Sequence, residues 1–238
     1  MARVYFVGAG PGDPDLITVK GLSLLQRADV LVYTGSLINP LLVDTCSAPV
    51  KIDSHGMKLE AIAETLVRHA RSGSLVVRLH SGDPSLYGAI VEQIQLLGKA
   101  GVDVEVVPGV SSLFAAAAAL KTQLTLGGVA ESLIVTRPAG TTLEEDEIGE
   151  LSTHRATMVF FLGTAHLEDI TARVRCPPST PAAVVYHASW DDQVVVRGTV
   201  ADIAGKAREA GIERTALLII GGVLDPSGSG HRRSHLYS

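Results

Sequence analysis

Cysteine is scarce in this chain of 238 residues, which contains only Cys46 and Cys176. The two lie far apart in the sequence and match neither a disulfide framework nor the paired spacing of a zinc site. We therefore expect ordinary thiols in a reducing compartment. Of the 8 histidines, only His231 and His235 in the C-terminal tail have the spacing His-x-x-x-His, and we expect no protein-bound metal.

The chain also lacks a long apolar run and an excess of positive charge. The apolar segment 113–120 is too short to cross a bilayer and predicts a buried helix. Residues 1–10 show no basic region followed by an apolar stretch and a cleavage site. The net charge of -5 provides no general attraction to nucleic acid. We therefore predict a globular cytoplasmic protein without a membrane or nucleic-acid partner.

Strand-like and helix-like segments alternate through the first half of the chain. This alternation predicts a mostly parallel sheet covered by helices. The predicted strands are 4–7, 30–33, 50–52, 75–79 and 102–107, the predicted helices are 18–28, 59–70 and 87–100, and a short helix begins at Asn39-Pro40.

The second half has a different pattern, which predicts a mixed sheet. Its predicted strands are 133–136, 158–162, 182–186, 193–197 and 216–220, with a helix over 200–210. Only a few residues separate 182–186 from 193–197, so these strands should be antiparallel neighbours. The acidic stretch 144–150 is expected to form a solvent-exposed helical face.

Together these patterns predict an α/β protein of two domains. Residues 1–120 would form an N-terminal α/β domain with a mostly parallel sheet. Residues 121–238 would form a C-terminal mixed α/β domain, with an irregular tail from about residue 225. The boundary is placed near 121–130, where Gly127-Gly128 interrupts the pattern.

Three loops of the first half follow predicted strands, where ligands bind in parallel α/β sheets. They are Gly8–Pro14, Ser81–Gly88 and Pro108–Ser112. The glycines allow the backbone to approach a ligand closely, and the prolines stiffen the turns. A nicotinamide site is disfavoured, because the third glycine of the dinucleotide pattern is misplaced and Tyr33-Thr34-Gly35 stands where a ribose-binding acid should follow the second strand.

Each loop alone has a simpler explanation. The Asp83 carboxylate can meet a ligand's ammonium group or ribose hydroxyls. It can equally cap a following helix, with Pro84 at the first helical position. The loop 108–112 can likewise serve only as a cap.

Taken together and in this order, the three loops resemble those of the tetrapyrrole (corrin and porphyrin) methylase family. The resemblance runs from residue 4 to about 223 and includes three later blocks, 159–163, 196–199 and 216–221. Segments 33–39, 78–90, 135–140 and 233–238 are similar to the precorrin-4 C11-methyltransferases of this family. Two departures are Thr34, where alanine is commoner, and Leu162, where methionine is frequent. Leucine is apolar and of similar size, so packing against adenine is retained.

The resemblance implies two α/β domains with S-adenosylmethionine (SAM) in a cleft between them, a cytoplasmic homodimer, and an anionic tetrapyrrole substrate. It implies methyl transfer to C11 of precorrin-4 or cobalt-precorrin-4 in cobalamin biosynthesis, giving precorrin-5 and S-adenosylhomocysteine. Any cobalt would belong to the substrate. The cofactor-binding residues implied are Pro11, Ser81, Gly82, Asp83, Leu86, Ser111, Ser112, Leu162, His187, Ala188, Ala216 and Leu217.

No residue stands out as a strong base. Asp13 is the candidate for orienting the substrate or handling a proton, with capping of a turn as the equal alternative. Arg78, Arg137 and Lys20 are candidates for binding substrate carboxylates, although surface solubility would also explain each of them. His80 adjoins the central loop and is a further candidate for substrate contact.

Three alternatives remain open from the sequence. The acceptor can be another corrin position, or a protein or RNA target of the same superfamily, although the anionic balance argues mildly against RNA. The chain can also be a SAM-binding module without turnover.

Overall fold

The computed structural model describes residues 2–140, 143–225, 227 and 230–232. The segment 233–238, which contributed to the resemblance, lies outside the described residues. The chain divides into two compact units, Met1–Ser112 and Leu113–Ser238.

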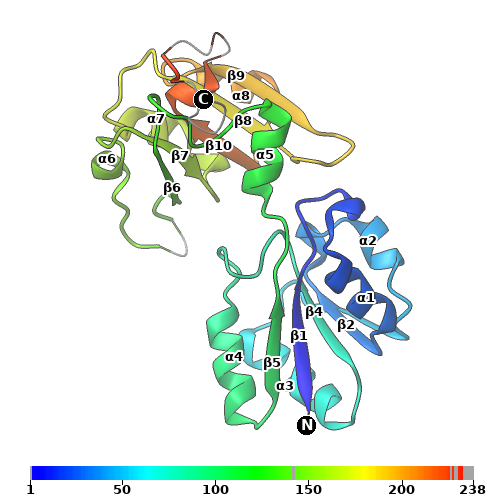
Figure 1. Ribbon diagram of the computed structural model, residues 1–238. Coiled ribbons are helices and arrows are strands. Elements are labelled where there is room, and N and C mark those ends of the chain that lie inside the picture. The colour runs from blue at the N-terminus through cyan, green and yellow to red at the C-terminus, as the bar shows by residue number, and fades with distance from the viewer. Residues whose placement is uncertain (1, 141–142, 226, 228–229, 233–238) are drawn as a thin grey trace. The chain divides into compact units, whose positions relative to one another are not determined.

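The first unit contains a five-stranded sheet in which every neighbouring pair is parallel. Its spatial order is β3-β2-β4-β1-β5. The strands are β1 (Arg3–Gly8), β2 (Val30–Tyr33), β3 (Val50–Asp53), β4 (Val76–His80) and β5 (Asp103–Val107). The predicted parallel sheet is thus confirmed, and β1 lies between β4 and β5 (Figure 1).

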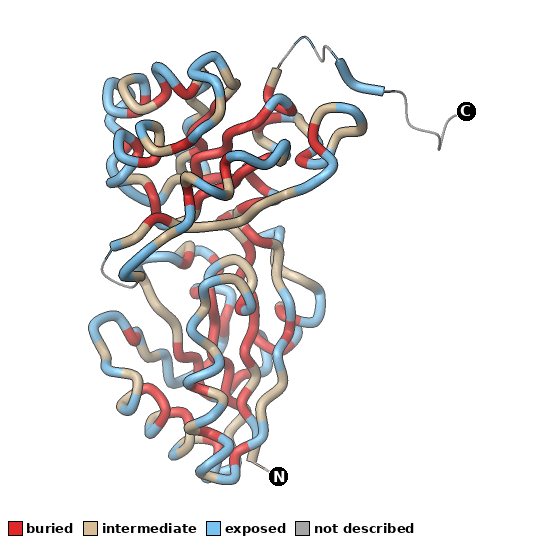
Figure 2. The backbone as a smooth tube through the Cα atoms, turned by 90° about the vertical axis from the view of Figure 1, so that its left-hand side faces the viewer, coloured by how far each residue is buried: buried red, intermediate tan, exposed pale blue. Residues whose placement is uncertain are grey.

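Helices cover both faces of this sheet. One face packs against α1 (Val19–Arg27) and α2 (Pro40–Asp44), and the other against α3 (Leu59–Arg71) and α4 (Ile90–Lys99). All five residues of β4 are buried, as expected for a parallel strand covered on two sides. Figure 2 shows the buried residues concentrated along the strands of the unit.

Helix α4 begins three residues later than the predicted start at residue 87. Tyr87 and Ala89 have φ values of 55° and 46°, in the left-handed region that a right-handed helix excludes. Gly88 has no room for a side chain, because a Cβ there would overlap the Pro84 carbonyl. The segment therefore forms a compact loop after Asp83 instead of a first helical turn.

The second unit contains a mixed five-stranded sheet in the order β6-β7-β10-β8-β9. Only β6 and β7 are parallel, and the predicted antiparallel pairing of β8 with β9 is confirmed. The strands are β6 (Ser132–Thr136), β7 (Ala156–Phe160), β8 (Pro181–Tyr186), β9 (Val194–Thr199) and β10 (Ala216–Ile220). One face packs against α5 (Ser112–Leu120), and the other against α6 (Ile148–Leu151), α7 (Leu167–Arg173) and α8 (Ile203–Glu209).

The division between the units falls after Ser112, the first residue of α5, whereas the sequence placed it between residues 120 and 121. Leu113, Ala116 and Leu120 of this helix are buried in the same cluster as Val159 and Ile219 of the second sheet. The helix therefore belongs to the second core, and Gly127-Gly128 lies in a connection inside that unit.

The acidic stretch 144–150 forms the predicted exposed helical face only in part, because its helix begins at Ile148 and the side chain of Asp146 is buried. The Asp146 side chain is 1% exposed and accepts hydrogen bonds from the backbone N–H groups of Ala139 at 2.6 Å and Ile148 at 3.1 Å. The Arg173 guanidinium also forms an ion pair with the Asp146 carboxylate. Burial raises the pKa of this carboxyl, but these hydrogen bonds outweigh burial and lower it overall. The prediction therefore fails for Asp146 and for the non-helical residues 144–147, whereas Glu144, Glu145, Glu147 and Glu150 are exposed as expected.

Candidate cofactor-binding and active site

The three predicted loops meet at one edge of the first sheet. They follow β4, β1 and β5, which are adjacent parallel strands and therefore end side by side. The first two loops are joined by backbone hydrogen bonds from Gly10 N to Gly82 O at 3.2 Å and from Gly82 N to Gly10 O at 2.8 Å. The structure thus brings together residues that are about 100 positions apart in the sequence.

Glycine allows this close approach. A Cβ on Gly8 would lie 2.5 Å from Gly109 Cα and 2.7 Å from Gly82 O. A Cβ on Gly109 would overlap the same Gly82 carbonyl. Gly82 also has a φ of +60°, which side chains rarely adopt. The loops consequently pack backbone against backbone and leave no space for a side chain at Gly8 or Gly109.

Asp83 links the second loop to the third. Its Oδ1 accepts hydrogen bonds from the Ser85 backbone N–H at 2.8 Å and from the Ser85 hydroxyl. Its Oδ2 accepts from the Gly109 backbone N–H at 2.8 Å. Burial raises the pKa of Asp83, but the bonds from Ser85 and Gly109 prevail and lower it. The carboxylate is therefore ionised at neutral pH.

Asp83 does not cap α4, which begins seven residues later. It does cap the turn that follows it, because its side chain accepts from the Ser85 N–H and its carbonyl accepts from the Leu86 N–H at 3.2 Å. A carboxylate offers about four acceptor sites, and three are used within the loops. One site remains for a ligand donor such as an ammonium group or a ribose hydroxyl, so the donor set of SAM fits this position.

The other predicted residues of the first unit differ in accessibility. Ser81 is exposed, Pro11, Leu86 and Ser112 are half-buried, and Ser111 is buried. Asp13 precedes the short helix Pro14–Leu16, and its Oδ1 accepts from the Asp15 backbone N–H at 2.9 Å. Turn capping is thus one role of Asp13.

The predicted residues of the second unit gather at one edge of the second sheet. Strand β10 runs antiparallel to β7 and β8, so its start lies beside the ends of both. His187 N donates to Thr215 O at 3.3 Å, and the Thr164 hydroxyl bonds both the N–H and the carbonyl of Ala216 at 3.1 Å. Leu162, His187-Ala188 and Ala216-Leu217 therefore belong to one edge.

Two of these residues have unusual conformations. Leu162 is 62% exposed with a φ of 54°, and His187 has a φ of 45°. The His187 ring stacks between Tyr186 and Trp190, with centroid distances of 3.8 and 4.8 Å. Exposed apolar surface on strained backbone is typical of ligand contacts. Leu217 differs, because its side chain is buried in the core of the second unit.

The basic candidates do not form a group. Lys20 pairs with Glu105 at 2.5 Å, so its charge is already compensated. Arg137 is half-buried just after β6. Arg78 is 5% exposed, which excludes the surface-solubility explanation. A charged residue inside the otherwise apolar run 75–79 was the sequence signal for this burial.

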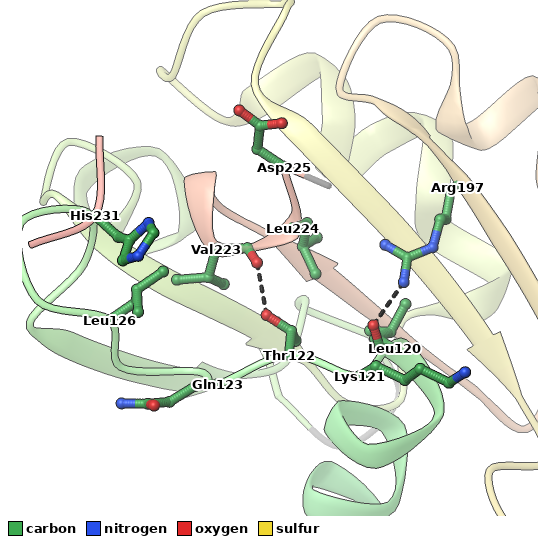
Figure 3. A pocket seen from close by; sticks show the side chains of 10 residues that line it. All are labelled: Leu120, Lys121, Thr122, Gln123, Leu126, Arg197, Val223, Leu224, Asp225 and His231. Carbon is green, nitrogen blue, oxygen red and sulfur yellow. Dashed lines mark hydrogen bonds between the residues drawn. The ribbon is translucent and has the colours of Figure 1, made fainter. Parts of the chain in front are cut away.

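A separate cavity of about 430 Å³ lies in the second unit, at the C-terminal end of α5 (Figure 3). The Arg197 guanidinium donates to the Leu120 carbonyl at 2.7 Å and so caps this helix end. The Thr122 hydroxyl donates to the Val223 carbonyl at 2.6 Å. The lining contains none of the predicted site residues.

Among the described residues, no helix is long and apolar enough to cross a membrane. The same residues contain no group of three or more histidine, cysteine, aspartate or glutamate side chains that could hold a metal ion.

The sequence and the fold define the class of protein. The family described as Tetrapyrrole (Corrin/Porphyrin) Methylases matches residues 3–204, and the chain belongs to this family. The chain is 49% identical to a cobalt-precorrin-4 C(11)-methyltransferase of Methanocaldococcus jannaschii, over 94% of this chain and 89% of the relative. It is 46% identical to a precorrin-4 C(11)-methyltransferase of Pseudomonas aeruginosa, over 94% and 92%.

Solved structures agree with this assignment. The X-ray structure of a cobalt-precorrin-4 methyltransferase, a cobalamin biosynthetic enzyme, superposes with a TM-score of 0.91 at 42% identity, covering 94% of this chain and 97% of the other. A uroporphyrin-III C-methyltransferase of Thermus thermophilus, complexed with S-adenosylhomocysteine, gives a TM-score of 0.78 at 31% identity, covering 94% and 93%.

Proposed function

We propose that this chain transfers the methyl group of SAM to C11 of precorrin-4 or cobalt-precorrin-4, in cobalamin biosynthesis. The observation that carries the proposal is identity of 42–49% to C11-methyltransferases over 94% of the chain. Identity to a uroporphyrin-III methyltransferase is lower, at 31%. C11 is therefore better supported as the methylated carbon than another position of the macrocycle.

The proposed chemistry is a direct displacement. SAM supplies an electrophilic methyl group on a sulfonium, and a nucleophilic ring carbon takes it as neutral S-adenosylhomocysteine leaves. Because the leaving group is good, the residues need to align and dehydrate the reactants more than to exchange protons. This agrees with a site built from close-packed backbone and the ionised carboxylate of Asp83.

The proposed SAM contacts in the first unit are the three converging loops, with Pro11, Ser81-Gly82-Asp83, Leu86 and Ser111-Ser112. In the second unit they are Leu162, His187, Ala188, Ala216 and Leu217. The homodimer implied by the resemblance stays a prediction.

Incubation with ¹³C-methyl SAM and precorrin-4, followed by NMR of the product, tests the acceptor. We expect one label at C11. A label at another carbon would refute the position, and binding of SAM without any transfer would favour a module without turnover. Parallel incubation with cobalt-precorrin-4 compares the two substrate forms.

We also propose that Asp13 orients the substrate. Asp13→Asn preserves an acceptor for the Asp15 N–H but removes the charge, so the short helix 14–16 should remain capped. A hydrogen bond to a charged group contributes about 1.5–3 kcal/mol, so kcat should fall about tenfold or more. Single-turnover rates at saturating SAM provide the measurement.

Asp13→Ala is the companion variant, because it removes both the cap and the charge. If Asp13 only caps the turn, Asp13→Asn will keep the wild-type kcat and Asp13→Ala alone will lose thermal stability. That pattern would contradict an orienting role.

A further inference from the structure

Arg78 is a buried cation that the proposed mechanism does not use. Its side chain lies on the α3–α4 side of β4 and donates only to neutral oxygens: Ser54 Oγ at 2.9 Å, Gln93 Oε1 at 3.3 Å and Thr34 Oγ1 at 3.5 Å. Among the described residues, no carboxylate forms an ion pair with it. Burial lowers the pKa of Arg78 to about 10, so the guanidinium remains charged at neutral pH. Asp53 raises the pKa of Arg78 electrostatically but forms no ion pair with it, so this buried charge is only partly compensated and favours a further anion.

The Asp53 carboxylate compensates this charge only in part. Asp53 accepts hydrogen bonds from the backbone N–H groups of Gly35 at 3.0 Å and His55 at 2.9 Å, and these bonds lower its pKa. It therefore shapes the loops after β2 and β3. His80, two residues further on β4, is 8% exposed, and its Nε2 has no hydrogen-bond partner among the described residues. Burial lowers the pKa of His80 to about 3, so this ring is neutral.

The hydroxyl groups beside Arg78 are oriented by it. Ser54 Oγ donates to the Tyr33 carbonyl at 2.9 Å, so its oxygen can accept from Arg78. Thr34 Oγ1 lies 3.1 Å from Ser54 Oγ and also accepts from Arg78. Its hydrogen can therefore point to Ser54 or to a ligand. Thr34 is half-buried and follows β2, at the sheet edge where the loops after β1 and β4 also lie.

We propose that Arg78, Ser54 and Thr34 form a recognition site for one carboxylate of the tetrapyrrole, with Thr34 as the contacting donor and Arg78 as the compensating charge behind it. Arg78 is thus a positioning residue, and Thr34 helps determine affinity for the anionic substrate. The inference rests on the proposed function, because it takes the tetrapyrrole as the ligand.

Thr34→Val tests the site, since valine keeps the shape of threonine and removes the hydroxyl. We expect KM for the tetrapyrrole to rise about tenfold, with kcat, the SAM dissociation constant and Tm close to wild type. Thr45→Val is the matched control, because the Thr45 hydroxyl bonds only the carbonyl of Leu42 in its own helix turn. An unchanged KM in Thr34→Val, or an equal weakening of SAM binding, would overturn the proposal.

Arg78→Gln removes the charge and keeps hydrogen-bonding groups. In wild type KM should rise with salt concentration, because salt screens the attraction, and in Arg78→Gln this dependence should be weaker. Equal salt dependence in the two proteins would contradict the electrostatic role. If Arg78→Gln does not fold, Thr34→Val still decides. Transfer to C11 by the wild-type chain is measured first, so failure of the proposed function is seen separately.

Discussion

Replacing Asp83 with alanine is expected to raise the dissociation constant for SAM about a hundredfold while the chain remains folded. The substitution removes the free acceptor site and the bond that holds Gly109, so the second and third loops lose their link. Two bonds to a charged group contribute roughly 3 kcal/mol or more, which corresponds to about a hundredfold. Isothermal titration calorimetry measures the affinity, and circular dichroism checks the fold.

The control for Asp83 is Asp202→Ala, which removes another turn-capping carboxylate. Asp202 accepts from the Thr199 N–H at 2.6 Å and pairs with Lys206 at 2.6 Å, in the turn between β9 and α8. The Asp202→Ala substitution should leave SAM affinity unchanged. Equal affinities of Asp83→Ala and wild type would refute the assignment of Asp83.

The lowered pKa of Asp83 adds a dependence on pH. A carboxyl whose pKa is lower in the folded state stabilises the fold above its unfolded pKa, and this contribution is lost as pH falls through the folded pKa. The loop link should therefore persist from neutral pH to below the ordinary carboxyl range of about 3.9. Loss of SAM affinity already between pH 6 and 5 would argue against a link through ionised Asp83.

The strands and the three loops could be predicted from sequence because both depend on local signals. Alternating apolar runs fix the strands, and the glycines and prolines fix the loops between them. The order of the strands in the sheet does not follow from such local signals. That β1 lies between β4 and β5, so that Gly8, Gly82 and Gly109 come into contact, depends on pairings between distant segments.

The differences from the predictions have the same origin. Residues 87–89 suit a helix locally, but packing around Asp83 and Pro84 places them in a loop. Asp146 has the pattern of a surface acid, yet Arg173 and two backbone N–H groups hold it inside. Surface solubility remained an alternative for Arg78, because no local signal shows which residues, here Gln93, Ser54 and Thr34, surround it.

The contact between the glycine loops provides the most demanding test of the site. A methyl group at residue 109 would overlap Gly82 O and press on Gly8, and both are backbone atoms that cannot rotate away. Gly109→Ala should therefore destabilise the fold by about 3 kcal/mol, the upper end for overpacking. For a chain of this size the Tm should fall by roughly 6–12 °C, and SAM affinity should fall with it because the Gly109 N–H is displaced from Asp83.

Gly98→Ala separates this effect from the general cost of replacing a glycine. Gly98 lies in α4 with nothing within 4 Å of a Cβ, so alanine should raise stability by about 0.5–1 kcal/mol through its better helix propensity. The two substitutions add the same methyl group, and their opposite signs would isolate the loop contact as the cause. If Gly109→Ala kept the wild-type Tm and SAM affinity, the loops would have to separate without cost. Close backbone packing would then not be what forms the site.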